Sequence, residues 1–348
     1  MIKRRNILAL LVAGGLVGVS DAPSVSPTQA VDVVAEVVEN VASTLTGNKG
    51  HLGFDTGIYP GDETMRVWRA TAPYKWVGYY LPAPCHKDDS WSGKRAQLDS
   101  MGWGMAVIYV GQQTWSGVPA KHSTVYRTTY RTKTVTKYVN KRVKTYVKNK
   151  KTGKRTAKYV TKRVPTKVKA RVPVRTAVRV AFDESKHGVM SCQRNLVTAS
   201  RGALEAADAV AKTAAEGFPR GTVVFLDVER MQVTPKAMRD YYKEWVARVL
   251  ADGRFTPGVY AHVHNAPLIY RDVKAVFEAA GRTDEPPFWV AGGRNFSPTK
   301  APHEVGHAFA AVWQGVLDVV QEWSGHKVLI DVNVAETPSP SLHRIETD

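Results

Sequence analysis

Short apolar runs recur along the chain from about residue 51, and polar or amphipathic stretches separate them. Runs that are apolar throughout are typical of strands buried on both faces of a sheet. The amphipathic stretches Leu196–Glu216 and Pro235–Asp252 have the spacing of helices. The pattern predicts eight strands, at His51–Asp55, Trp76–Leu81, Gly104–Val110, Val223–Asp227, Gly258–Ala261, Phe288–Ala291, Ala311–Trp313 and Val328–Asp331.

Buried strands that alternate with helices predict an α/β fold with a parallel sheet covered on both faces. Eight such strands fit a (β/α)8 barrel of the TIM type, which we expect to span residues 51–335. A doubly wound open sheet is the alternative. Residues 336–348 are expected to form a C-terminal tail.

Two carboxylates end the fourth predicted strand, in the stretch VVFLDVERM. Side chains alternate along a strand, so Asp227 and Glu229 point the same way, with Cα atoms roughly 6.6 Å apart. Neighbouring carboxylates tend to have different pKa values, which suits general acid/base chemistry. The alternative is a strand that ends in solvent, with both acids hydrated.

Other predicted strands also end in polar residues. Asp55 ends the first strand, Trp313 and Gln314 end the seventh, and Asp331 ends the eighth. The carboxyl ends of the strands of a barrel meet at one face, where catalytic residues converge. The sequence therefore predicts a cleft lined by carboxylates.

The N-terminus has the features of an export signal. The adjacent Arg4 and Arg5 precede an apolar run that is too short for a membrane span, and Thr28–Ala30 offers a cleavage site. The arginine pair resembles a twin-arginine signal. An ordinary secretory signal or an uncleaved anchor are alternatives. We therefore expect residues 1–30 to direct export to the cell envelope or beyond it, and residues 31–50 to form a linker with a short helix.

Two cysteines, Cys85 and Cys192, are present in the whole sequence. An exported protein meets an oxidising compartment, where two cysteines allow one pairing. We expect a disulfide, with two buried free thiols as the alternative. Two isolated cysteines are a poor metal site without further ligands.

The positive charge of the chain is confined to one segment. Residues 121–182 contain 21 Lys and Arg and no Asp or Glu, whereas the rest has 28 basic and 31 acidic residues. Val, Thr and Tyr alternate with the cations, and the segment KYVNKRVKTYVK recurs 21 residues later as KYVTKRVPTKVK. Val and Thr favour strands. We expect a β-hairpin arm inserted after the third strand, with its turn at Lys151–Lys154; a disordered tether is the alternative.

The basic arm should bind a polyanion, because counterion release favours such complexes. Anionic wall polymer or lipid headgroups are the candidates for an exported protein. Export argues against nucleic acid as the main ligand. The alternative is that the basic segment is a solubilising linker without a binding partner. We expect a monomer.

Several motifs together resemble a known family. The chain is similar to the bacterial secreted glycoside-hydrolase-like domain of unknown function, which is related to the family-25 lysozymes, or muramidases. The resemblance covers roughly Gly53 to Ala335, apart from the basic segment. It rests on the ordered motifs GFDTG, WVGYYL, GMAVIYVGQQTW, FLDVERM, PGVYAHVHNA, FWVAGG, VWQG and LIDVNVA.

The resemblance implies roles for the four acids. Glu229 would protonate the glycosidic oxygen, and Asp227 would support the developing positive charge or orient the acetamido group of the substrate. Asp55 and Asp331 would line the cleft. Two carboxylates flanking the bond are the general requirement of this chemistry. The expected function is hydrolysis of cell-wall glycan of the peptidoglycan type. The alternative is a non-catalytic envelope glycan-binding protein, anchored by its basic arm.

Flat aromatic rings and amides should accompany a sugar site. Of the aromatic residues near strand ends, we expect Tyr260 and Trp313 to line the cleft. We expect Gln112 and Gln314 to bond sugar hydroxyls, and His262 to be a polar lining residue. No metal or other cofactor is expected. The remaining aromatic residues near strand ends are Tyr80, Tyr109, Trp115 and Trp289.

Overall fold

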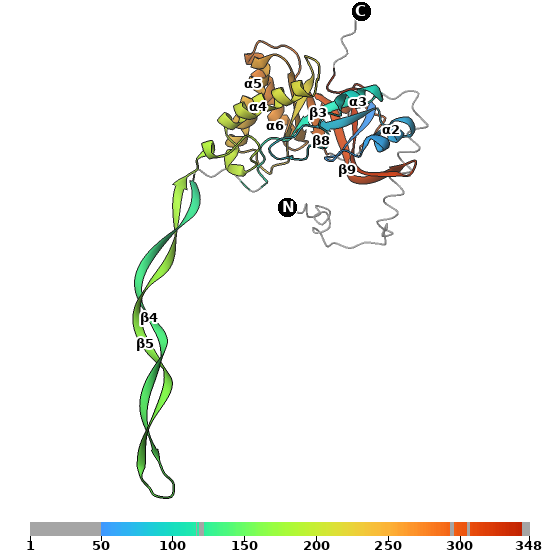
Figure 1. The fold of residues 1–348 in the computed structure, drawn as a ribbon. Coiled ribbons are helices and arrows are strands. Elements are labelled where there is room, and N and C mark those ends of the chain that lie inside the picture. The colour runs from blue at the N-terminus through green and yellow to red at the C-terminus, as the bar shows by residue number, and fades with distance from the viewer. Residues whose placement is uncertain (1–49, 116, 118–121, 293–295, 305–306, 343–348) are drawn as a thin grey trace, which may run out of the picture.

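A closed barrel of eight strands forms the body of the protein (Figure 1). The structure is a computed structural model that describes residues 50–342, apart from 116, 118–121, 293–295 and 305–306. The strand order is β1-β10-β9-β8-β7-β6-β3-β2, which confirms the predicted barrel over the open sheet. The barrel strands are β1 (His51–Asp55), β2 (Trp76–Tyr80), β3 (Gly104–Tyr109), β6 (Val223–Val228), β7 (Thr256–His262), β8 (Phe288–Ala291), β9 (Ala310–Trp323) and β10 (His326–Ala335).

In the described part of the chain, helices follow four of these strands, β1, β2, β6 and β7, and a fifth helix lies between the basic segment and β6. The two amphipathic stretches seen in the sequence form α4 and α5. Thr198 caps the start of α4, where its side chain accepts a hydrogen bond from the backbone N–H of Arg201, and Gly253 caps the end of α5 in the left-handed conformation. No helix in the described part of the chain is long and apolar enough to span a membrane. The helices are α2 (Asp62–Thr71), α3 (Arg95–Ser100), α4 (Ala199–Ala215), α5 (Lys236–Asp252) and α6 (Ala266–Ala279), with short 3₁₀ turns η2 (Glu184–Lys186), η3 (Arg194–Leu196) and η4 (Pro302–Glu304).

The last two barrel strands depart from a regular (β/α)8 pattern. β9 and β10 form an antiparallel hairpin through Ser324 and Gly325, which both have positive φ. A two-residue turn of this kind joins antiparallel strands, whereas parallel strands need a long crossover. The sequence predicted Asp331 at the end of its strand, but the structure places it inside β10. It reaches the rim because β10 runs antiparallel to β1, in register with Asp55 at the end of that strand.

Aromatic rings fill the barrel below this rim. The Trp289 ring lies edge-on to Trp76, Phe225 and Tyr260, with centroid separations of 5.5, 5.6 and 5.7 Å. Gly53 leaves the space that the Trp76 ring needs, because a Cβ there would lie 2.2 Å from it. The packed rings make the interior a core and not a pore, so a ligand can enter only above them.

Residues near the C-terminus complete the barrel wall between β3 and β6. The Ser339 and Ser341 hydroxyls accept hydrogen bonds from the backbone N–H groups of Met105 and Val107. The Ser341 carbonyl accepts from Val223 N. Part of the expected tail thus pairs with strand edges. The predictions for residues 1–30 and 31–49, and for the last six residues of the tail, fall outside the described residues.

The basic segment contains two long paired strands. β4 (His122–Lys148) and β5 (Arg155–Ala181) form an antiparallel two-stranded sheet of their own, in continuous register. At the far end, the Asn149 side chain accepts from Lys151 N, and Gly153 has a positive φ. The ribbon leaves the barrel after β3 and projects away from it (Figure 1).

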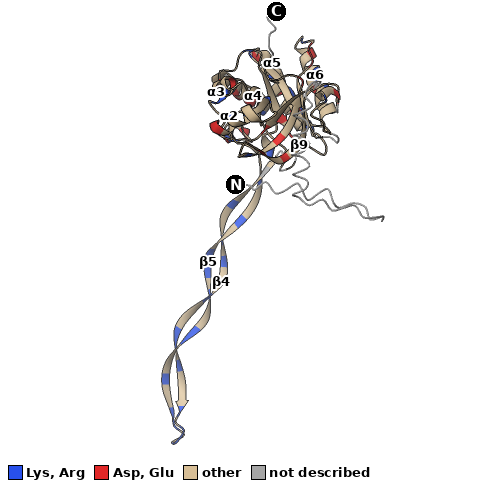
Figure 2. Ribbon diagram, turned by 90° about the vertical axis from the view of Figure 1, so that its right-hand side faces the viewer, with Lys and Arg blue, Asp and Glu red and all other residues tan. Residues whose placement is uncertain are grey.

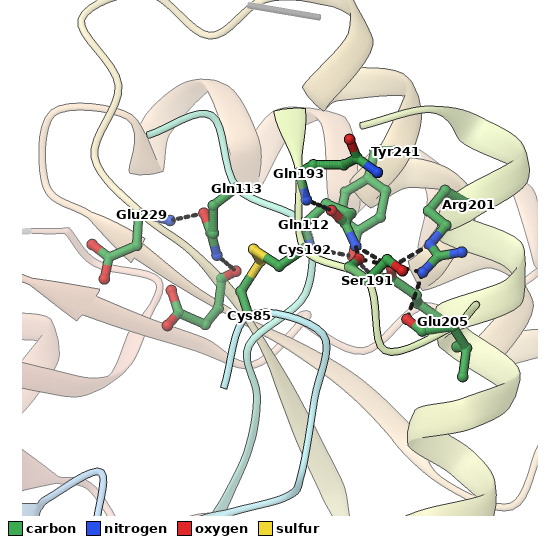
Figure 3. Close-up of a disulfide and its surroundings, with 12 residues drawn as sticks. Cys85, Gln112, Gln113, Ser191, Cys192, Gln193, Arg201, Glu205, Glu229 and Tyr241 are labelled. Atoms are coloured by element: carbon green, nitrogen blue, oxygen red, sulfur yellow. Dashed lines mark hydrogen bonds and ion pairs between the residues drawn. A yellow bond between two sulfur atoms is a disulfide. The ribbon is translucent and has the colours of Figure 1, made fainter. Parts of the chain in front are cut away.

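A disulfide lies where the ribbon meets the barrel. Cys85 and Cys192 are bonded, with Cα atoms 5.0 Å apart, which confirms the expected pairing. Cys85 follows β2, and Cys192 lies on the segment that returns from β5 to α4. The bond therefore ties the root of the ribbon to the barrel rim (Figure 3).

We expect reduction of this disulfide to lower the free energy of unfolding by about 2–4 kcal/mol, because the bond restricts the unfolded chain over a sequence separation of 107. Urea unfolding with and without reductant measures the difference. The double variant Cys85→Ser/Cys192→Ser serves as the control and should not respond to reductant. Equal midpoints for the oxidised and reduced wild type would contradict a stabilising role.

Candidate active site

A cavity of about 160 Å³ opens at the barrel rim. All four predicted acids line it, and so do Tyr260 and Gln314. The acids come from three strands or their ends: Asp55 ends β1, Asp227 lies near the end of β6 with Glu229 just beyond that strand, and Asp331 lies on β10. The remaining lining residues are Thr56, Gly57, Tyr80, Cys85, His86, Ile108, Val110, Trp115, Trp289, Asp318, Leu329 and Ile330.

Asp55 is almost fully buried and is held from three sides. It accepts hydrogen bonds from the Tyr80 hydroxyl at 2.6 Å, from Gln314 Nε2 at 2.8 Å and from Asn333 Nδ2 at 2.8 Å. An ionised carboxylate, which only accepts, satisfies three donors at once. Asp55 thus organises the neighbouring polar groups of the cleft wall.

Gln314 connects opposite sides of the barrel. Its Oε1 accepts from the Tyr260 hydroxyl at 2.7 Å, while its Nε2 donates to Asp55 and, at 3.2 Å, to Asp331 Oδ2. Asp331 also accepts from the backbone N–H of Asp318 at 2.6 Å. These bonds fix the orientation of the Gln314 amide, so this residue lines the cleft mainly as a bridge between its walls.

The pair of acids on β6 is fixed by one buried amide, that of Gln113. Gln113 Nε2 donates to the carbonyl of Asp227 at 2.7 Å, and its Oε1 accepts from Glu229 N at 3.2 Å (Figure 3). Gln113 itself is 3% exposed. Both backbone groups that flank the strand end are thereby held against the segment after β3.

Two tyrosines supply neutral donors to the cleft. Burial, followed by the nearby Asp55 carboxylate, raises the pKa of Tyr80 well above its usual value. Burial, followed by Glu229 and Asp227, does the same to the pKa of Tyr260. Both hydroxyls therefore stay protonated at physiological pH. None of the described cleft-lining residues is Lys or Arg, so the cleft is anionic and disfavours a polyanionic ligand.

Two residues predicted to line the cleft lie elsewhere. Trp313 lies on the opposite face of β9 from Gln314. Its indole N–H donates to the Gly292 carbonyl, and its ring centroid lies 4.9 Å from that of Phe296. Gln112 is fully buried and donates to Glu205 Oε1 and to the Ser191 carbonyl. Both errors have one cause: neighbouring residues in extended chain point to opposite sides.

His262 shares a side of β7 with Tyr260 but does not line the cavity. Its Nδ1 accepts a hydrogen bond from the backbone of His264. Burial, with Arg230 and His264 nearby, lowers the pKa of His262, which favours its neutral form. Within the described residues, no group of three or more His, Cys, Asp and Glu is arranged to hold a metal ion.

Sequence reasoning missed three residues around the cavity, namely Gln113, His86 and Asp318. The sequence did indicate a polar residue at the position of Gln113, because two glutamines, Gln112 and Gln113, follow the third strand. It could not show which of the two points to the cleft. His86 lies beside Tyr80, with ring centroids 4.8 Å apart. Trp115, at 60% exposure, stands at the cleft mouth as the most accessible aromatic ring of the lining.

Solved structures with similar backbones were found at low sequence identity. An uncharacterized B. stearothermophilus protein is 14% identical, with a TM-score of 0.44, and the match covers 82% of this chain and 96% of that one. The spore cortex lytic enzyme SleM of Clostridium perfringens is 11% identical, with a TM-score of 0.43 and coverage of 84% and 68%. The Tat-secreted protein Rv2525c of Mycobacterium tuberculosis is 12% identical, with a TM-score of 0.40 and coverage of 84% and 97%.

The search of curated proteins gave no significant match. A family model matches residues 66–335, most of the chain, and describes an Rv2525c-like, glycoside hydrolase-like domain. This match agrees with the resemblance that the strand-end motifs carry. The chain belongs to the family of Rv2525c-like, glycoside hydrolase-like domains.

Proposed function

We propose that the protein is an exported glycoside hydrolase that cleaves cell-wall glycan of the peptidoglycan type. The observation that carries this proposal is the cleft itself, where carboxylates from β1, β6 and β10 face one cavity. Membership of a glycoside hydrolase-like family supports the same chemistry. A wall glycan is neutral along its sugar backbone, and this suits a cleft whose described lining has several carboxylates and no Lys or Arg.

Glu229 is the proposed general acid. It lies just beyond the end of β6, and in its protonated form it would give its proton to the glycosidic oxygen as the bond between that oxygen and the anomeric carbon breaks. Asp227 would stabilise the positive charge that develops on the sugar, or orient its acetamido group. Water then adds to the anomeric carbon, and its proton restores Glu229.

The other two acids have supporting roles in this scheme. Asp55 is occupied by donors from Tyr80, Gln314 and Asn333, so it orients its neighbours and adds negative charge below the sugar. Asp331, bonded to Gln314 and to the Asp318 backbone, does the same from β10. Preorganised charge of this kind stabilises an oxocarbenium-like transition state without reorganisation during the reaction.

The remaining parts of the chain fit an enzyme of the cell envelope. Residues 1–30 would export it, by the twin-arginine or the general route, and the disulfide would form after export. The basic ribbon would hold the enzyme on an anionic component of the wall or membrane. Incubation of the protein without residues 1–30 with isolated peptidoglycan tests the proposal, and the appearance of new reducing ends is the expected result.

We expect Gln113→Ala to lower kcat by about 10- to 100-fold with little change in KM, because a small displacement of catalytic groups has effects of this size. The substitution removes the amide that fixes the Asp227 and Glu229 backbone. Gln193→Ala is the matched control, since the Gln193 side chain bonds to His187 instead. Equal effects of the two substitutions on kcat would show that Gln113 does not position the acids.

A further inference from the structure

The ribbon formed by β4 and β5 has two chemically different faces. In its antiparallel register, residues directly opposite one another share a face, and the register runs from His122↔Ala181 to Lys148↔Arg155 without a shift. All five tyrosines of the two strands fall on one side, which we call the tyrosine face. All twelve valines fall on the other, the valine face. The tyrosine face carries Tyr126, Tyr130, Tyr138, Tyr146 and Tyr159.

A cation covers every ring on the tyrosine face. The guanidinium groups of Arg175, Arg171 and Arg163 lie 5.2, 5.3 and 5.8 Å from the ring centroids of the β4 tyrosines 126, 130 and 138. Each of these arginines stands opposite the residue two positions beyond its tyrosine, so one diagonal arrangement recurs three times. Arg142 covers the ring of Tyr159 at 4.9 Å, and Lys144 that of Tyr146 at 5.6 Å.

The stacked arginines are free to bind an anion. Residues 121–182 contain no Asp or Glu with which they could pair, and the rings themselves remain 53–63% exposed. A guanidinium that lies on a ring keeps its planar fork, which matches the two oxygens of a phosphate. Figure 2 shows Lys and Arg along the whole ribbon, which carries none of the acidic residues coloured in the described part of the chain.

The distribution of cations on β5 favours a long ligand. From Arg163 to Arg179, every cation of β5 points to the tyrosine face, while the opposite row from Val164 to Val180 has none. This stretch is roughly 50 Å long at the rise of a β-strand. A row of that length suits a chain with repeating charge better than a single small anion. The exposed rings between the cations can contact the uncharged units of such a chain.

We propose that the tyrosine face of the ribbon binds a linear phosphodiester polymer of the cell wall, a chain of polyol or sugar units joined by phosphates. The choice of a wall polymer over nucleic acid rests on the proposed function. A lipid bilayer fits less well, because Arg127, Arg131 and Lys133 of β4 lie on the valine face and would have to enter the apolar region with it. A second ribbon would bring like charges together.

The anionic cleft and the cationic ribbon then bind different ligands. The described lining of the cleft has five carboxylates and no Lys or Arg, so it disfavours the phosphodiester polymer. The ribbon attracts that polymer and is tied to the cleft rim by the Cys85–Cys192 bond. Glycan is thus presented to the cleft while the neighbouring wall polymer is held by the ribbon.

Two triple variants with equal loss of charge test the proposal. Arg163, Arg171 and Arg175→Gln remove cations of the tyrosine face, and Arg127, Arg131 and Lys133→Gln remove cations of the valine face. Binding of poly(glycerol phosphate) is measured on the full chain carrying Glu229→Gln, so that hydrolysis does not enter the result. We expect the tyrosine-face variant to weaken binding by about tenfold or more, and the valine-face variant by less than about threefold. Equal losses would overturn the proposal.

A charge-preserving variant guards against a loss of ribbon structure. Arg163, Arg171 and Arg175→Lys keep the charge but remove the planar fork, and should weaken binding by about three- to tenfold. Binding equal to the parent would overturn the assigned chemistry. Single-stranded DNA, polyglutamate and phosphatidylglycerol vesicles are the comparison ligands, and tighter binding of any of them than of poly(glycerol phosphate) would overturn it too. Failure of glycan hydrolysis with polymer binding intact would instead refute only the proposed enzyme.

Discussion

Glu229→Gln is expected to lower the rate of glycan hydrolysis by about 10²- to 10⁴-fold, the usual contribution of a general acid. Glutamine keeps the size of the side chain and removes the proton that the leaving oxygen needs. The backbone N–H of Glu229 bonds to Gln113 and is untouched by the change, so the fold should be preserved. Initial rates of reducing-end release at several substrate concentrations measure the effect.

Glu278→Gln provides the matched control, because Glu278 is an exposed residue of α6 outside the cleft. It should leave the rate unchanged, and both variants should unfold at the wild-type urea concentration. If Glu229→Gln retained the wild-type rate while remaining folded, another group would be the proton donor, and the roles assigned to the β6 pair would be wrong.

Arg201→Ala is expected to lower the free energy of unfolding by about 3–5 kcal/mol, because it leaves a buried carboxylate without its cation. The Arg201 and Glu205 side chains are 1% and 0% exposed, and Arg201 Nε donates to Glu205 Oε1 at 2.7 Å. The guanidinium also donates to the carbonyls of His187, Gly188 and Val189 (Figure 3 shows the pair). The substitution therefore also frees the segment that returns from the ribbon to α4.

The loss of unfolding free energy in Arg201→Ala should depend on pH, and its direction follows from the pKa of Glu205. Burial raises the pKa of Glu205, and the donors Tyr241, Gln112 and Arg201 oppose this shift. A carboxyl whose folded pKa is above its unfolded value contributes stability that is full below the unfolded pKa and is lost as pH rises through the folded pKa. Removal of Arg201 raises the folded pKa further. The variant should therefore lose more stability at neutral pH than near pH 4.

Arg248→Ala is the control for this experiment. Arg248 and Glu244 form an ion pair at the same i,i+4 spacing on α5, but the Arg248 side chain is 61% exposed. Its removal should cost no more than about 0.5 kcal/mol at any pH. A similar cost for both arginines in urea titrations would mean that the buried pair does not stabilise the rim.

The barrel strands were predictable because they are short apolar runs bounded by polar or turn residues. The direction of β10 was not predicted. The signal for it was local, in the Ser324–Gly325 turn, whereas the long apolar stretches on either side resemble strands of either direction. Apolar content shows that a strand is buried, but it does not show which neighbour the strand pairs with.

The acids of the cleft were predictable because carboxylates at the ends of buried strands are costly without a role. It was harder to predict which of two neighbouring side chains points to the cleft. Trp313 and Gln314 are neighbours, as are Gln112 and Gln113, and in each pair the structure turns one residue to the cleft or its acids and the other away. Hydrogen bonds between residues far apart in the sequence, such as that from Asn333 to Asp55, determine which side chain points inward. The local sequence pattern does not reveal such bonds.

The most direct test of the account is the identity of the reducing end that the protein releases from purified peptidoglycan. The products are reduced with borohydride and analysed by mass spectrometry, with the Glu229→Gln variant treated in parallel. The account predicts soluble fragments with a newly reduced wall sugar for the wild type and none for the variant. No new reducing ends from the wild type, over a range of pH and wall preparations, would contradict hydrolysis and leave a glycan-binding protein.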